Sequence, residues 1–191
     1  MIVEPPAESD ATGHVADMYA GDIKTDGFVF AYTRVMAINP EAHEAFEALI
    51  RAIVPSIGVR TYELATLGAA RGIRSRHCLL AHGRKTLRAA AMDEEQLQRA
   101  AVDYRDADLS PADVAVMAYA EKMSTDAAGM TDADSQSLRD HGFTDRQIVD
   151  ITLAAGARNY FSRSLQALAV PLEDVPGLSP ELVDALLSPT R

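Results

Sequence analysis

Residues 63–82 read ELATLGAARGIRSRHCLLAH, and this segment carries the strongest structural signal in the chain. Alanine and leucine are frequent in it, alternating runs of β-branched residues are absent, and Gly72 interrupts it. The spacing of apolar residues predicts one helix over 62–71 and a second over 75–91. We expect these helices to pack as an antiparallel hairpin through Gly72, which would bring their side chains together.

The rest of the chain gives similar helical signals. Several apolar runs with a period near 3.6 begin at a capping residue, as at Ser110, which is followed by Pro111 at the first helical position. On these grounds the sequence predicts further helices over about 12–20, 41–54, 94–102, 111–123, 132–141, 145–169 and 180–187. Because strand signals are scarce, the predicted fold class is all-α.

Two regions between the predicted helices are less regular. Pro55 and Gly58 are expected to end the helix over 41–54, because proline removes a backbone donor and glycine commonly terminates helices. Residues 28–36 are apolar but short, and their pattern fits a helix or a strand equally well.

Length, charge and cysteine content narrow the classes of protein to which this chain can belong. The chain has 191 residues, which suits a single domain over 1–191, with a core at about 10–170 and a tail at 172–191. A net charge of −10 argues against a nucleic-acid partner, and a single cysteine excludes an intramolecular disulfide. Neither a signal peptide nor an apolar run of about 20 residues is seen, so we expect a cytoplasmic protein without membrane association.

Four groups in this segment can carry proton or sulfur chemistry, namely Glu63, His77, Cys78 and His82. On a helix Ser75, Cys78 and His82 share one face, so an imidazole lies one turn from a thiol. Such an imidazole can take the thiol proton or stabilise the reactive thiolate, and Glu63 on the preceding helix can orient it. The residue types alone also fit a buried cysteine and a packed histidine without any chemical role.

Other constellations are weaker. The remaining histidines are isolated in sequence: His14, His43 and His141. His43 is followed by Glu44 and Glu47, which we interpret as a polar helix surface rather than as metal ligands. His77 and His82 lack the further ligands of a zinc site, so no metal is expected. There is also no glycine-rich nucleotide loop and no serine-hydrolase elbow, so no cofactor is expected.

The pattern Glu-x(11)-Cys-x-His-Cys-x(3)-His is typical of the alkylhydroperoxidase D and carboxymuconolactone decarboxylase superfamily. This chain resembles it, with serine at the first cysteine position, through Glu63, Ser75, His77, Cys78 and His82. Residues 138–145 resemble the family element LR-x-x-G-F-[ST]-[DE]. Residues 159–163 resemble its NxFNR element, with Ser162 where asparagine is usual. Residues 11–19 look like the lead-in of the longer, peroxidase-related branch, so the likeness covers most of residues 10–170.

The resemblance implies an all-α fold of antiparallel helix pairs that assembles into trimers or hexamers. In members with both cysteines, the thiol that matches Cys78 attacks the peroxide or relays electrons, and the thiol that matches Ser75 closes a disulfide with it. The residues that match Glu63, His77 and His82 form a proton relay, and a dithiol partner supplies the electrons. All five positions are therefore candidate catalytic residues.

The serine at position 75 departs from this scheme. Serine cannot form a disulfide, and no second cysteine exists, so a dithiol cycle within one subunit is impossible. Cys78 can instead work as a one-cysteine peroxidase that an external thiol reduces. Alternatively, the chemistry does not use sulfur and relies on acid–base catalysis by His82 and Glu63, as in the decarboxylase branch. A third alternative is that Ser75 is an engineered replacement.

The first functional prediction is a thiol-dependent peroxidase-like oxidoreductase that uses Cys78 with a Glu63–His82 relay. The alternatives are a carboxymuconolactone decarboxylase-like lyase or isomerase that uses His82 and Glu63, and a non-catalytic family member. The expected partners are a peroxide or small carboxylic acid as substrate, an external thiol reductant, and copies of the same chain in a dimer, trimer or hexamer.

Basic residues cluster around the motif: Arg71, Arg74, Arg76, Arg84, Lys85 and Arg88. Such a cluster can stabilise a thiolate or attract an anionic substrate. We interpret it chiefly as a solvated helix surface with ion pairs.

Overall fold

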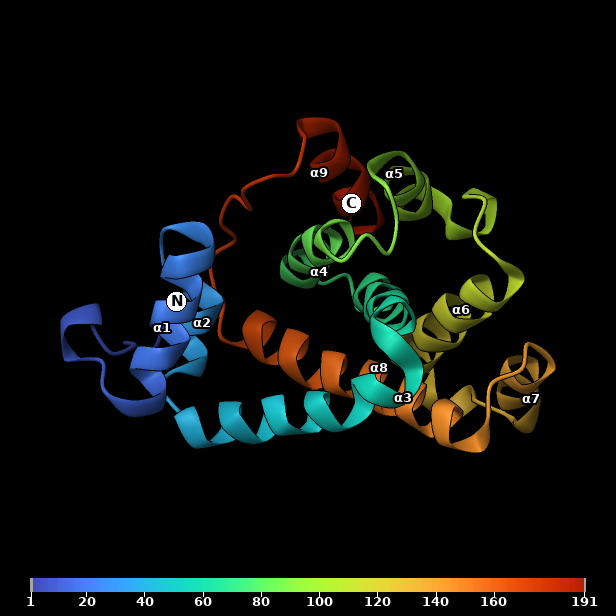
Figure 1. Cartoon of the computed structure of the whole chain (residues 1–191), viewed down its shortest axis with the longest axis horizontal. Helices are drawn as coiled ribbons and strands as arrows, with labels where there is room; N and C mark the ends of the chain where they lie inside the picture. The colour runs from blue at the N-terminus through green and yellow to red at the C-terminus, as the bar shows by residue number, and fades with distance from the viewer. Residues whose placement is uncertain (1, 191) are drawn as a thin grey trace.

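The computed structural model describes residues 2–190, and within them it contains helices and no strand. The fold is therefore all-α, as the sequence predicts. The helices are α1 (Gly13–Asp26), α2 (Ala31–Met36), α3 (Pro40–Gly72), α4 (Arg76–Arg88), α5 (Glu94–Asp103), α6 (Pro111–Thr125), α7 (Asp132–Asp140), α8 (Asp145–Ala167) and α9 (Pro180–Leu187). Figure 1 shows α1 and α2 together at one end of α3, away from α5, α6 and α7.

The long helix α3 organises the molecule. Its first part runs past Pro55 and is interrupted at Gly58, close to the end that the sequence analysis expected, and its second part continues to Gly72. A kink occurs at Gly58, which has φ 77° and ψ 161°, a conformation that only glycine adopts without strain. Gly58 therefore separates two helical parts of α3, and these run in different directions (Figure 1).

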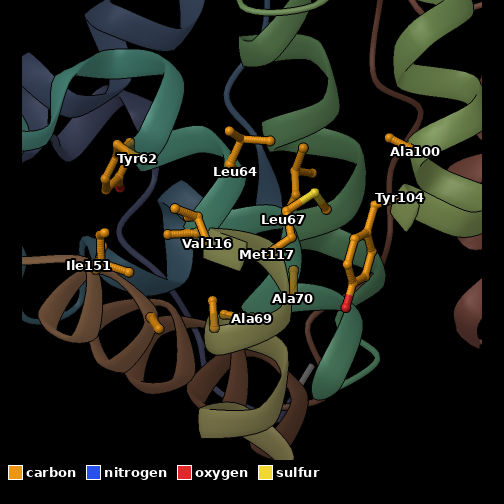
Figure 2. Close-up of a cluster of buried hydrophobic side chains, with 14 of the residues drawn as sticks. Tyr62, Leu64, Leu67, Ala69, Ala70, Ala100, Tyr104, Val116, Met117 and Ile151 are labelled. Carbon is orange, nitrogen blue, oxygen red and sulfur yellow. The ribbon is translucent and has the colours of Figure 1, made fainter. Parts of the chain in front are cut away.

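The second half of α3 is the centre of the core. Its residues from Tyr62 to Ala70 are all buried, and α3 as a whole packs against α4, α6 and α8. Figure 2 shows Leu67 of this half beside Met117 of α6. A Cβ atom added to Gly68 would lie 2.5 Å from the carbonyl oxygen of Met117, so the glycine allows the two helices to approach closely.

The capping residues predicted from sequence are present. The Ser110 hydroxyl accepts a hydrogen bond from the Asp113 amide at the start of α6, and Pro111 occupies the first helical position. Capping boxes open α7 and α8, and Ser179 caps α9. These local signals explain why most predicted helix ends lie within two or three residues of the observed ones.

The segments at the two ends of the chain, α1 with α2 and the tail with α9, pack against the central helices. Phe30 is extended and caps α2, which begins at Ala31, and this helix resolves the open choice between helix and strand. Asp26 at the end of α1 forms ion pairs with Arg84 and Arg88, and these tie α1 to α4. In the tail, α9 packs against α4 and α5.

No helix among the described residues is long and apolar enough to cross a membrane.

Candidate functional site

A cavity of about 630 Å³ lies between α1, α2, α3, α4 and α8. Its wall includes Cys78 and His82 of α4, Tyr62 of α3 and Arg158 of α8. The aromatic rings of Phe46 and other residues contribute apolar surface to the same wall. The cavity thus places the candidate catalytic residues beside an apolar surface of the kind that binds small organic molecules.

The start of α4 positions Cys78. Ser75 is the N-cap residue, with extended backbone angles, and Arg76 is the first helical residue, so Cys78 lies in the first turn. Its side chain is only 2% exposed. The hydroxyl of Ser162 donates a hydrogen bond to the sulfur over 2.7 Å, and Nη1 of Arg158 donates over 3.5 Å. Two donors from α8 and the helix N-terminus thus surround the sulfur, and all three favour a negative charge on it.

Arg158 is a buried cation with unusual partners. It is 4% exposed, and its Nη2 atom donates to the hydroxyl of Tyr62 over 3.3 Å. The guanidinium also lies 5.4 Å from the ring centroid of Phe161. Burial disfavours its charge, but interactions with Cys78 and Tyr62 outweigh burial and raise the pKa of Arg158. Because a buried charge is costly without compensation, a thiolate at Cys78 would stabilise this arrangement.

Glu63 and His82 form a buried pair. Oε2 of Glu63 lies 2.7 Å from Nδ1 of His82, as the predicted helix hairpin requires. Burial, with the positive charge of Arg158 adding to it, lowers the pKa of His82 to about 3, so the imidazole is neutral at pH 7. Burial opposes ionisation of Glu63, but the interaction with His82 prevails, and the pKa of this carboxyl lies below its ordinary value. The carboxylate then accepts the Nδ1 proton, which leaves the lone pair of Nε2 free to act as a base.

The Cys78 sulfur and the His82 imidazole line the same cavity, but each forms hydrogen bonds with different residues. His82 follows Cys78 by one helical turn, and both side chains line the cavity. In the described part of the chain, however, the hydrogen bonds of the Cys78 sulfur run to Ser162 and Arg158 rather than to His82.

The other two motif positions lie differently. Ser75 is fully buried, and its hydroxyl has no hydrogen-bond partner among the described residues. His77 is partly exposed, and its Nε2 atom is 3.0 Å from the carbonyl oxygen of Pro171. That contact links α4 to the segment after α8, and His77 also lines the cavity but has no hydrogen bond to Glu63 or His82 among the described residues.

Three of the six basic residues around the motif form ion pairs. Arg71 bonds to Glu121, while Arg84 and Arg88 bond to Asp26. The cation that contacts the sulfur is instead Arg158, which the sequence analysis missed. Its only sequence signal is its position directly before the 159–163 element, in which Ser162 was noted for replacing the usual asparagine.

A second group of polar residues gathers in the same cavity wall. Nε2 of His14 lies 3.2 Å from Nδ1 of His43, and a carboxylate oxygen of Glu47 completes a cluster within 4.8 Å. The sequence analysis treated His14 and His43 as isolated because they are 29 residues apart. Packing of α1 against α3 brings them together, and this cluster is the one among the described residues with the composition of a metal site.

The buried pair predicts a pH dependence of stability. Between about pH 5 and 6.5 the unfolded chain protonates His82, whereas the folded chain excludes that proton, so the free energy of unfolding should rise with pH by up to about 1.4 kcal/mol per unit. His82→Gln retains a donor for Glu63 but should lose this part of the slope in denaturant titrations. His141→Gln changes an exposed histidine and should keep it. Equal slopes in the natural chain and His82→Gln would contradict the neutral assignment of His82.

Comparisons with known proteins bear on the fold. The sequence matches no family model and no curated protein. Among solved structures, it is similar to an alkylhydroperoxidase AhpD core, an uncharacterized peroxidase-related protein from Ralstonia eutropha JMP134. The TM-score is 0.78 and the identity 22%, over 98% of this chain and 96% of that one. An uncharacterized peroxidase-related protein from Silicibacter sp. TM1040 gives a TM-score of 0.66 at 24% identity, over 88% of this chain and 87% of that one.

A third similar structure is that of the debrominase Bmp8. Its TM-score is 0.76 at 18% identity, over 100% of this chain and 98% of that one. One of its crystal structures holds a cysteine-to-alanine variant in complex with 2,3,4-tribromopyrrole. The three likenesses show that this chain has the AhpD-like fold, in agreement with the resemblance found in the sequence.

Proposed function

We propose that this chain, which has the AhpD-like fold, is a thiol-dependent peroxidase-like oxidoreductase with Cys78 as its nucleophile. The observation that carries the proposal is the pair of donors on the buried sulfur, the hydroxyl of Ser162 and the guanidinium of Arg158. Hydrogen bonds from a hydroxyl and a cation favour the thiolate, which is the nucleophilic form of cysteine. The likeness to peroxidase-related structures supports the same class of reaction.

In the proposed reaction the Cys78 sulfur attacks the terminal oxygen of a hydroperoxide. A sulfur–oxygen bond forms, the oxygen–oxygen bond breaks, and the sulfur is oxidised by two electrons to a sulfenic acid. His82 takes the thiol proton through the bound substrate or a water and returns it to the leaving alkoxide, so the products are the sulfenic acid and an alcohol. Glu63 orients the imidazole through the 2.7 Å contact and keeps Nε2 as the basic atom.

The second half of the cycle needs an external thiol. Because Ser75 replaces the cysteine that would close a disulfide, one thiol must condense with the sulfenic acid and release water. A second thiol then attacks the mixed disulfide, regenerates the Cys78 thiol and leaves as an external disulfide. The aromatic surface of the cavity favours an organic hydroperoxide over hydrogen peroxide as the oxidant.

The test is consumption of peroxide with dithiothreitol as reductant, measured for hydrogen peroxide, tert-butyl hydroperoxide and cumene hydroperoxide. We expect catalytic turnover that stops after alkylation of Cys78. Consumption no faster than in buffer, for all three oxidants, would contradict the proposal. A brominated pyrrole belongs in the same screen, because the debrominase Bmp8 shares the fold.

A second candidate is decarboxylase-like or isomerase-like acid–base chemistry. The buried Glu63–His82 pair supports it, since the carboxylate orients a neutral imidazole whose Nε2 atom can accept a proton. In this case small lactones and carboxylic acids should be turned over by the Cys78→Ala variant as well as by the natural chain. Loss of that turnover in Cys78→Ala would count against the sulfur-independent mechanism.

We also propose that the chain assembles with copies of itself. Val149, Leu153 and Tyr160 of α8 are between 43% and 53% exposed and follow one another at helical spacing, which leaves an apolar strip on the surface. Size-exclusion chromatography with light scattering should give a mass of at least two chains. A monodisperse species of 20.6 kDa would contradict the proposal.

A further inference from the structure

The cluster of His14, His43 and Glu47 lies in the wall of the cavity that also contains Cys78 and His82. His14 belongs to the first turn of α1, and His43 and Glu47 are one turn apart near the start of α3. All three side chains are partly buried. The cluster therefore joins two helices that are separate in sequence, at a position that a small molecule in the cavity can reach.

The spacing of the nitrogen atoms fits a metal ion. Zinc binds histidine nitrogens at about 2.0–2.1 Å, so two nitrogens on a tetrahedral ion lie about 3.3–3.4 Å apart. Nε2 of His14 and Nδ1 of His43 are 3.2 Å apart. The ligand atoms of the whole cluster lie within 4.8 Å of one another, so the Glu47 carboxylate has to move by about 1.5 Å at most to complete the set.

The chemistry of the donors fits as well. Two imidazoles and one carboxylate are a set that holds zinc and other first-row divalent metals, with at least one coordination position left open. A direct hydrogen bond between the two rings explains the 3.2 Å contact without a metal, and the Glu47 carboxylate also forms an ion pair with Arg51 over 3.6 Å. What the hydrogen bond and the ion pair leave unexplained is the gathering of all three ligand atoms within 4.8 Å, and a divalent cation would use all three together.

We propose that His14, His43 and Glu47 form a binding site for a first-row divalent metal ion, with Zn²⁺ as the first candidate. The ion ties α1 to α3 and presents an open coordination position at the cavity wall, where it can hold an oxygen or anionic group of a bound ligand. This site is separate from the Cys78 sulfur and does not depend on the redox function proposed above.

The test is titration of Zn²⁺ into the full-length chain after chelation and dialysis, followed by calorimetry and by metal analysis of the dialysed complex. We expect one Zn²⁺ per chain. His14→Ala and His43→Ala should each weaken binding by at least about 100-fold, since loss of a ligand exceeds the 10–100-fold typical of outer-shell changes. Zn²⁺ should also raise the melting temperature of the natural chain but not of these variants.

Two control variants separate this site from other zinc-binding groups. His141→Ala removes an exposed histidine that bonds to the Ser137 carbonyl, and it should bind Zn²⁺ like the natural chain. Cys78→Ser removes the thiol and should also retain binding. If either alanine variant unfolds, as judged by circular dichroism, Glu47→Gln replaces it in the comparison. The proposal is overturned if the chain binds no Zn²⁺, if the ligand variants bind it unchanged, or if Cys78→Ser abolishes binding.

Discussion

Replacing Cys78 by serine is expected to abolish thiol-dependent peroxide turnover, with a loss of about 10³-fold or more. Removal of a nucleophile has effects of this size because the covalent route disappears altogether. Serine is close in shape to cysteine, and its oxygen can accept the hydrogen bonds from Ser162 and Arg158, so the fold should persist. The measurement is the initial rate with cumene hydroperoxide and dithiothreitol for the natural chain and Cys78→Ser.

This comparison also separates the candidate functions. Peroxide turnover within tenfold of the natural rate in Cys78→Ser would contradict a sulfur nucleophile. Activity of the same variant on lactones or small acids would favour the Glu63–His82 mechanism instead. Unchanged circular dichroism and melting temperature are required of the variant, because the thiol is buried in the core beside Leu79 and Leu80.

Replacing Arg158 by methionine is expected to slow both peroxide turnover and alkylation of Cys78 at neutral pH by about 10–100-fold. A hydrogen bond that involves a charged group contributes about 1.5–3 kcal/mol, and here it favours the thiolate over the thiol. Methionine keeps much of the length and apolar contact of the side chain but removes the charge. The rate of reaction with iodoacetamide measures the effect on the sulfur directly.

Arg163→Met is the matched control for this variant. Arg163 lies on the same helix but is exposed, and it bonds to Asn159 and the Ser124 carbonyl rather than to the sulfur. Cys78 in Arg163→Met should react with iodoacetamide as fast as in the natural chain. Arg158→Lys restores the positive charge without the planar guanidinium and should recover part of the alkylation rate that Arg158→Met loses. Equal alkylation rates in Arg158→Met and the natural chain would contradict the claim that Arg158 increases the reactivity of Cys78.

Local signals explain how much of the fold could be predicted from the sequence. Helix starts at Ser110, Thr131, Thr144 and Ser179 carry their own caps, so the chain shows them without tertiary information. The bend in α3 is different, because a proline and a glycine three residues apart suggest an end. Gly58 does interrupt the helical backbone, but the sequence does not show that a second, buried helical part follows it directly.

Some contacts of the candidate site could likewise be predicted from local sequence, and others could not. Glu63 and His82 lie on consecutive helices, so their contact follows from the expected hairpin. The donors to Cys78 come from α8, 80 and 84 residues further along the chain, and periodicity contains no information about such a distant approach. His14 and His43 were treated as isolated for the same reason, since only the packing of α1 on α3 brings them together.

The central claim is that Cys78 reacts directly with a hydroperoxide, and trapping of its oxidised form tests this most directly. The natural chain is mixed with one equivalent of cumene hydroperoxide in the presence of dimedone, which reacts with sulfenic acids, and is then digested for peptide mass spectrometry. The account predicts a single dimedone adduct on Cys78, absent without peroxide and strongly reduced in Arg158→Met. A Cys78 peptide that keeps its free thiol while the peroxide remains unconsumed would contradict it.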